Sequence, residues 1–144
     1  MKSRVSHRRA FTLIELIAVI VVLAILAGVA LPKYFDYGSQ ARESATKGVL
    51  GGVRAGVANF YANSALTGTP TYPTLAQLQT LGTVMQEPIP ENPYNNDATI
   101  RDADTEWNST AGAAQATSGA NGWAYDETNG KFWANSSTAS ENTW

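Results

Sequence analysis

A long apolar run near the N-terminus limits what this chain can be more than any other feature. Residues 11–31 carry one charged side chain, Glu15, and as a helix they span about 31 Å, close to the thickness of a bilayer's hydrocarbon core. Residues 1–10 hold four bases and no acid, whereas residues 11–144 hold six bases and twelve acids. Because basic segments stay on the cytoplasmic side, the pattern predicts a cytoplasmic N-terminus and an exported polar head.

Three interpretations of the apolar run compete. The first is a secretory signal peptide, with the small residues Gly28 and Ala30 before a cut at Leu31. The second is a plain single-pass anchor. The third treats only residues 1–10 as a removable leader and keeps the apolar helix in the mature protein.

Glu15 favours the third interpretation. A carboxylate in an apolar span costs about 2.5–3.5 kcal/mol near the bilayer centre, and neither a signal peptide nor a passive anchor needs that cost. A cut between Ala10 and Phe11 would create an amino group about 6 Å from Glu15 along the helix. That amine is largely protonated at neutral pH and is a suitable counter-ion. The alternative is a tolerated acid that snorkels toward the headgroups.

Composition excludes several classes of function. The chain has no cysteine, which excludes a disulfide scaffold, a thiolate zinc site and a cysteine nucleophile. Its one histidine, His7, lies in the basic N-terminal segment, so no Ser–His or metal–His site can form around it. The net charge of −2 is not typical of a nucleic-acid-binding protein. We therefore expect neither an enzyme nor a nucleic-acid partner.

Helical spacing continues past the apolar run. Pro32 is expected to kink the helix or to mark the end of the membrane segment. Beyond it, a small and apolar stripe extends to a helix end near Asn63 or Gly68, and Glu43 and Lys47 form a favourable i,i+4 pair. The stripe is predicted to consist of Ala41, Ala45, Val49, Val53 and Val57, with Gly52, Gly56 and Phe60 alongside.

The polar head shows one short helix and one hairpin. Thr74 is predicted to be the N-cap of the helix, and Gly82 is predicted to terminate it. A loop over 127–130 pairs Tyr125 with Phe132 and Ala124 with Trp133, in a core expected to be aromatic. Residues 95–121 are predicted to be loop, and the tail over 136–144 is predicted to be mobile.

The predicted fold class is α+β. A long N-terminal α-helix, membrane-spanning in its first half, packs against a small C-terminal head with a short helix and an antiparallel hairpin. The predicted parts are a leader, a transmembrane helix, its amphipathic continuation and a globular head, at residues 1–10, 11–33, 34–68 and 69–144.

The residues around the predicted cut resemble a known family. Arg8-Arg9-Ala10 followed by Phe11-Thr12-Leu13-Ile14-Glu15-Leu16 is similar to the cleavage and methylation signature of type IV prepilins and type II secretion pseudopilins. The resemblance implies cleavage between Ala10 and Phe11, N-methylation of Phe11, and roles for Glu15 and Pro32 in assembly. One departure is Ala10, because the family usually has glycine before the cut. Alanine is the next smallest side chain, so we expect cleavage to persist.

That resemblance also implies the partners and the location. They are a prepilin peptidase and methyltransferase, identical subunits and minor pilins or pseudopilins in a helical filament, and an inner-membrane assembly machinery. The subunit would begin as a single-pass protein of the bacterial inner membrane and end in a periplasmic or cell-surface filament with the pilin fold.

The chain is predicted to be a structural subunit of a type IV pilus-like filament, and the function that it resembles most is the major pseudopilin of a type II protein secretion system. The run from Tyr72-Pro73-Thr74 to Asn92-Pro93-Tyr94 resembles the head of the major pseudopilin of type II secretion systems more than a typical pilin. The missing cysteines agree, because many pilins close their C-terminal region with a disulfide. The alternative is a type IV pilus subunit used for adhesion, motility or DNA uptake. A third, different class is a secreted or membrane-anchored binding module with a Sec-type signal.

An acidic segment of the head is a candidate calcium site. Calcium favours oxygen-rich flexible loops, and the resembling pseudopilins hold calcium in this part of the head. The EF-hand pattern is absent, and a solvated acidic loop is the alternative. The candidate ligands are Asp97, Asp102, Asp104 and Glu106, with Asn95 and Asn96 adding oxygen atoms.

Overall fold

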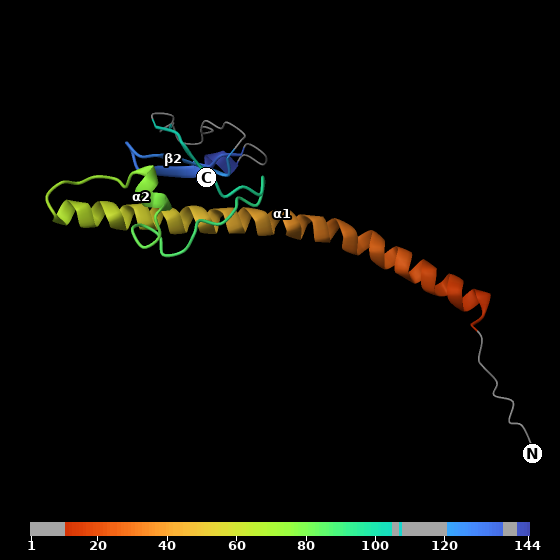
Figure 1. Cartoon of the computed structure of the whole chain (residues 1–144). Helices are drawn as coiled ribbons and strands as arrows, with labels where there is room; N and C mark the ends of the chain where they lie inside the picture. The colour runs from red at the N-terminus through yellow and green to blue at the C-terminus, as the bar shows by residue number, and fades with distance from the viewer. Residues whose placement is uncertain (1–10, 105–106, 108–120, 137–140) are drawn as a thin grey trace, which may run out of the picture. The chain divides into compact units, whose positions relative to one another are not determined.

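The computed structural model describes residues 11–104, 107, 121–136 and 141–144. The leader with Ala10, and Glu106 of the candidate calcium site, lie outside the described residues. The elements are α1 (Leu13–Leu66), α2 (Leu75–Gln79), β1 (Ile100–Asp102), β2 (Trp123–Asp126), β3 (Lys131–Ala134) and the 3-10 turn η1 (Glu141–Thr143) (Figure 1). A long N-terminal helix followed by a small head with a sheet confirms the predicted α+β class.

By internal packing, the chain divides into two compact units, Met1–Ser39 and Gln40–Trp144, and the boundary lies within α1. In the first unit, the side chains of α1 have no core to join: every residue from 11 to 39 is exposed. Pro32 lies inside α1, so the helix does not end there. It ends at Leu66, followed by Gly68 with a φ of 97°, within the predicted limits.

In the second unit, α1 presents one buried face to the head. Thr46, Leu50, Val53 and Val57 are buried, whereas Ala41 and Ala45 are exposed. The predicted stripe was therefore wrong at its N-terminal end. Steps of four residues turn by about 40° more than a full circle, so a stripe built only from such steps drifts off the face within three turns. The observed face alternates steps of four and three and stays aligned.

The sheet has the order β1–β2–β3. Strands β2 and β3 are antiparallel, with Tyr125 opposite Phe132 and Ala124 opposite Trp133, which confirms the predicted hairpin pairing. Strand β1 pairs parallel to β2, with Ile100 opposite Trp123. The segment 95–121 was predicted to be loop, and β1 corrects that prediction. Its three residues include one apolar side chain, too few for a period-two signal.

The head has an aromatic core, as predicted. Its largest fully buried side chains are Trp123, Trp133, Tyr125 and Phe132. The Trp123 and Phe132 rings stack with their centroids 5.4 Å apart, and the Trp123 indole donates to the Pro90 carbonyl over 2.9 Å. The buried hydroxyl of Tyr125 donates to the Pro73 carbonyl over 2.7 Å. Polar atoms of the two largest aromatic groups of β2 are thus satisfied inside the core.

Helix α2 begins as predicted and ends early. Thr74 and Gln77 form a capping box, in which the Thr74 hydroxyl accepts from the Gln77 backbone and the Gln77 side chain accepts from the Thr74 backbone. Thr80 turns extended and its backbone N–H closes onto Ala76 and Gln77, so the helix stops at Gln79 rather than at Gly82. Gly82, with a φ of 83°, instead serves a turn in which its N–H donates to Met85.

The end of the chain is packed rather than mobile, which corrects the predicted tail over its described part. The Arg54 guanidinium on α1 donates to the Phe132 carbonyl over 3.0 Å and to the Trp144 carbonyl over 2.5 Å. The Lys47 ammonium lies 4.7 Å from the centre of the Trp144 ring. Two cations of α1 therefore hold Trp144 against the helix. The sequence pattern of a polar tail gave no sign of these long-range contacts.

Candidate assembly site at the start of helix α1

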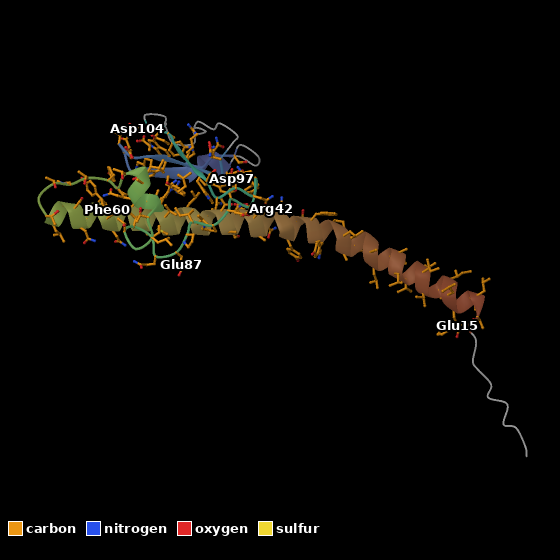
Figure 2. All side chains as sticks on the ribbon, in the orientation of Figure 1. Glu15, Arg42, Phe60, Glu87, Asp97 and Asp104 are labelled. Carbon is orange, nitrogen blue, oxygen red and sulfur yellow. The ribbon has the colours of Figure 1, made fainter. Side chains whose placement is uncertain are left out.

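Helix α1 begins with a reciprocal cap between Thr12 and Glu15. One carboxylate oxygen of Glu15 accepts from the Thr12 backbone N–H and from the Thr12 hydroxyl, both over 2.8 Å. The Thr12 hydroxyl in turn accepts from the Glu15 backbone N–H over 3.3 Å. This is a capping box, which satisfies donors that a helix N-terminus would otherwise leave free. Figure 2 labels Glu15 in the first turn of α1.

The capping box assigns Glu15 a role inside its own chain that the sequence analysis did not foresee. Thr12 is part of the motif around the predicted cut but is not among the predicted site residues. The pattern Thr-x-x-Glu just before an apolar run was the available signal. In a membrane, two hydrogen bonds and the positive end of the helix dipole reduce the cost of keeping this carboxylate in an apolar segment.

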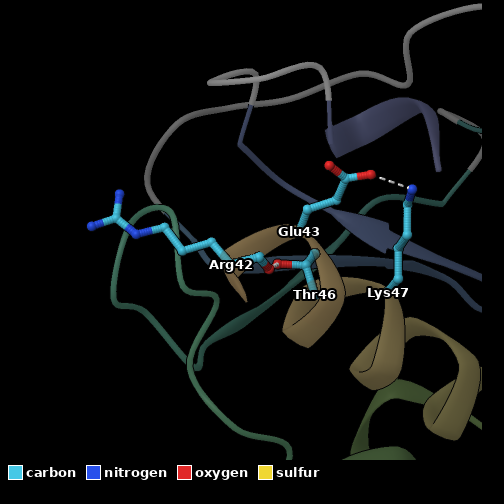
Figure 3. Close-up of polar contacts among 4 residues, drawn as sticks. All are labelled: Arg42, Glu43, Thr46 and Lys47. Carbon is cyan, nitrogen blue, oxygen red and sulfur yellow. Dashed lines mark hydrogen bonds and ion pairs between the residues drawn. The ribbon is translucent and has the colours of Figure 1, made fainter. Parts of the chain in front are cut away.

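The residues around Glu15 are apolar, and their side chains are exposed. Phe11 is 89% exposed and Leu13 is 75% exposed, and no residue of the most apolar part of α1 is buried. The described residues form one ion pair, and it joins Lys47 and Glu43 on α1 and does not involve Glu15 (Figure 3). That pair confirms the predicted i,i+4 contact. Within the described chain Glu15 thus has hydrogen bonds but no cationic partner.

Helix α1 is long and apolar enough to cross a membrane, with a mean hydropathy of 3.0 in its most apolar window. A secretory signal sequence meets the same criterion, so the helix alone does not distinguish the interpretations. A carboxylate held in the first turn, next to the residue that would carry the new amino group, is the chemical feature that a disposable signal does not need.

The described acids of the predicted calcium site are bonded individually. Asp97 precedes β1 and Asp104 follows it, at opposite ends of the strand (Figure 2). Asp97 accepts from the Thr99 hydroxyl and backbone N–H, which together lower the pKa of the Asp97 carboxyl. Asp102 accepts from the Asp104 backbone over 3.1 Å, and Asp104 accepts from the Thr128 backbone over 3.2 Å. Among the described residues, no group of three or more acidic or histidine side chains is arranged to hold a metal ion. Calcium binding stays a prediction.

A different acid of the head is buried with no hydrogen-bond partner in the described part of the chain. Glu141 in η1 is fully buried, and neither carboxylate oxygen has a partner among the described residues. Tyr94 lies near it: burial, followed by the charge of Glu141, raises the pKa of the Tyr94 phenol. Glu141 lies within the polar tail that was predicted to be mobile, so no sequence signal singles it out.

Comparison with known proteins places the start of the chain in a defined group. Residues 5–31 match the prokaryotic N-terminal methylation motif. The fimbrial protein EcpC of Eikenella corrodens is 37% identical over 59 residues, which cover 41% of this chain and 39% of EcpC. The type IV major pilin protein PilE of Neisseria gonorrhoeae is 41% identical over 59 residues, covering 41% of this chain and 35% of PilE.

One similarity extends into the head. The type IV major fimbrial protein FimA of Dichelobacter nodosus is 34% identical over 97 residues, covering 65% of this chain and 59% of FimA. The aligned part of the chain thus spans less than two thirds of each of these relatives. No solved structure matches the chain. The methylation motif, the apolar capped helix with Glu15 and the pilin relatives together support the type IV prepilin and pseudopilin family as the family of this chain.

Proposed function

We propose that this protein is a structural subunit of a type IV pilus filament, anchored in the membrane by α1 before it assembles. The observation that carries the proposal is the methylation motif over residues 5–31, which leads into helix α1. Residues 13–39 of this helix are all exposed. Lipid covers such a helix before assembly, and neighbouring copies of the same helix cover it afterwards. No catalytic role is proposed.

The proposed life of the subunit starts with processing. A prepilin peptidase cuts between Ala10 and Phe11, and a methyltransferase modifies the new amino group of Phe11. The amine stays basic after methylation. It pairs with Glu15, most usefully on an adjacent subunit, where the pairing fixes the axial offset between two otherwise featureless apolar helices. Pro32 supplies a locally weak point in α1 that can adjust as subunits pack.

The capping box refines this role of Glu15. Before assembly, Thr12 satisfies one carboxylate oxygen, while the other accepts no hydrogen bond from the described residues. The free oxygen is available to a cation without loss of the cap. Glu15 can therefore cap its own helix and bind the amine of a neighbour at the same time.

A pilus is favoured over a secretion pseudopilus by the relatives, which are named as pilins and fimbrial proteins. The second candidate, the major pseudopilin of a type II secretion system, is supported by the cysteine-free head. In that case calcium bound by Asp97, Asp102, Asp104 and Glu106 is part of the proposal. The partners are the same in both cases: minor subunits of the same class and an inner-membrane assembly machinery. Deleting the neighbouring genes and scoring surface filaments against protein export separates the two candidates.

Processing offers a direct test with a matched control. Ala10→Leu places a bulky side chain beside the scissile bond, so the leader is expected to remain and sheared filaments to disappear. Ala10→Gly restores the residue usual in the family and is expected to process at least as well as the natural chain. Gel mobility of the membrane-bound subunit and immunoblots of sheared filaments measure both steps. Normal maturation of the leucine variant would remove the proposed cleavage site.

A further inference from the structure

A short aromatic segment follows the apolar run of α1, and none of the described residues covers it. Tyr34, Phe35 and Tyr37 are 77%, 74% and 63% exposed. They lie in the first unit, after Lys33 and before the boundary at Ser39, and Asp36 separates Phe35 from Tyr37. Neither the capping site nor the proposed contacts of Glu15 uses them. Exposure of three large aromatic side chains to water is unfavourable, so we expect a partner or a surrounding medium to cover them.

The angular spread of the three rings around α1 indicates what covers them. At 3.6 residues per turn, the three rings cover an arc of about 160° around α1, and Lys33 and Asp36 occupy the rest of the circumference. A groove on a protein partner would cover one side of the helix. A medium that surrounds the helix contacts all five side chains at once. The mixture of aromatic, basic and acidic groups is typical of the headgroup level of a bilayer.

Their axial position fits the same medium. From Phe11 to Leu31 a helix rises about 30 Å, which matches the hydrocarbon core, and Tyr34 to Tyr37 follow about 5 to 9 Å beyond. The headgroup layer on each side is about 5 to 7 Å deep. Because helical side chains lean toward the N-terminus, the rings reach back into that layer.

We propose that Tyr34, Phe35 and Tyr37 form a belt that binds the phospholipid headgroup layer on the exported side and fixes the depth of α1 in the membrane. The inference rests on the proposed membrane-anchored function. The belt matters most after processing, because removal of residues 1–10 takes away the four bases that hold the other end of the helix at the cytoplasmic surface. With the belt in the headgroup layer, the Phe11 amine lies at the cytoplasmic edge of the hydrocarbon core. Glu15 then lies about one helical turn inside that core.

The cysteine-free sequence allows a clean measurement of depth. Single cysteines are introduced by Val22→Cys, Ala30→Cys and Gly38→Cys in the full chain, expressed without an assembly machinery. A Cβ at Gly38 meets nothing within 4 Å, so that variant disturbs no packing. A membrane-impermeant maleimide is applied from the exported side. We expect strong labelling of Gly38→Cys and protection of Val22→Cys and Ala30→Cys.

Two belt variants should then move the boundary between labelled and protected positions of α1 in opposite directions. Serine at all three aromatic positions prefers water, so labelling of Ala30→Cys should rise several-fold. Leucine at the same positions prefers hydrocarbon, so labelling of Gly38→Cys should fall several-fold. Leu66→Ser is the control, because Leu66 is 86% exposed and lies outside the belt. It should leave the boundary in place.

The other results overturn the belt in distinguishable ways. Equal labelling of all three positions in the natural background would refute the membrane span, and with it the proposed function. A span whose boundary ignores both belt variants would refute the belt alone. Efficient cross-linking of a Tyr34→Cys variant into dimers under these conditions would mean that a second copy, rather than lipid, covers the segment.

Discussion

The two halves of helix α1 place different demands on their side chains. Over residues 13–39, every side chain is exposed and the segment is uniformly apolar apart from its ends. Over residues 40–66, one face is buried against a head whose core includes the fully buried rings of Trp123, Tyr125 and Phe132, and the other faces carry charges. In the first half, the stability of the helix depends on the surrounding medium, so the overall apolar composition matters more than which residue stands at which position. In the second half, stability depends on contacts between individual side chains. Glu15 is an exception in the first half, because its carboxylate accepts two hydrogen bonds from Thr12.

The largest effect is expected from Glu15→Ala, which removes the one specific group of the first half. Filament formation should be lost, because the neighbour's amine loses its counter-ion and the axial offset is no longer fixed. Membrane insertion and leader cleavage should survive, because the helix becomes more apolar. The measurement compares processed subunit in membranes with sheared filament from the same cells.

Glu15→Gln is the matched control for charge. It keeps a side-chain oxygen that can accept from Thr12 but carries no negative charge. Impaired assembly in this variant would assign the effect to the ion pair rather than to the cap. Filaments of normal yield from the alanine variant would sink the pairing hypothesis, and loss of insertion would show that Glu15 acts before assembly.

In the second half, Trp123→Ala should destabilise the head by about 3–5 kcal/mol, the usual range for a buried large aromatic side chain. The ring is fully buried against Phe132 and bonded to Pro90. Trp123→Phe keeps most of the volume and should cost less. Thermal unfolding of the full chain in detergent, followed by near-UV circular dichroism, measures both. An unfolding temperature unchanged by the alanine variant would contradict the buried aromatic core.

Sequence reasoning succeeded where local chemistry decides the structure. The hairpin pairing of Tyr125 with Phe132 follows from a four-residue loop, which leaves few registers. The N-cap at Thr74 follows from side-chain chemistry within one turn. Sequence reasoning failed where the structure depends on contacts between residues that are far apart in the sequence. Strand β1 exists because Ile100 lies beside Trp123, and Trp144 is ordered because Arg54 reaches its carbonyl.

The candidate sites divide in the same way. The motif around Ala10, Phe11 and Glu15 could be identified from adjacent residues alone, whereas its use of Thr12 as a cap became evident only in the helix geometry. The burial of Glu141 depends on how the end of the chain packs on the head, which no local pattern encodes. Whether the acids near β1 bind calcium depends in part on Glu106, which lies outside the described residues.

A smaller, stabilising effect is expected at Glu141. A carboxylate buried without a hydrogen bond costs more free energy than a neutral amide of the same shape, so Glu141→Gln should raise the unfolding free energy at neutral pH by about 1–3 kcal/mol. Thermal unfolding of the two full-length chains under identical conditions measures it. A clear loss of stability would reveal that Glu141 has a cationic partner.

The smallest effect is expected from the N-cap of α1. Thr12→Ala removes the hydroxyl that bonds Glu15 and should destabilise the first turn by about 1 kcal/mol, whereas Thr12→Ser should be close to neutral. Hydrogen exchange of the amides of residues 13–16 in detergent reports the fraying. Equal protection in the alanine and serine variants would show that the cap does not hold this turn.

The central claim, that residues 1–10 are a leader and α1 is kept as the filament-forming helix, is tested most directly by the mass of the mature N-terminus. Intact-mass and peptide mass spectrometry of the subunit purified from membranes should find a chain that begins with N-methylated Phe11. A chain that begins at Leu31, or one that retains Met1 and the whole basic segment, would contradict it.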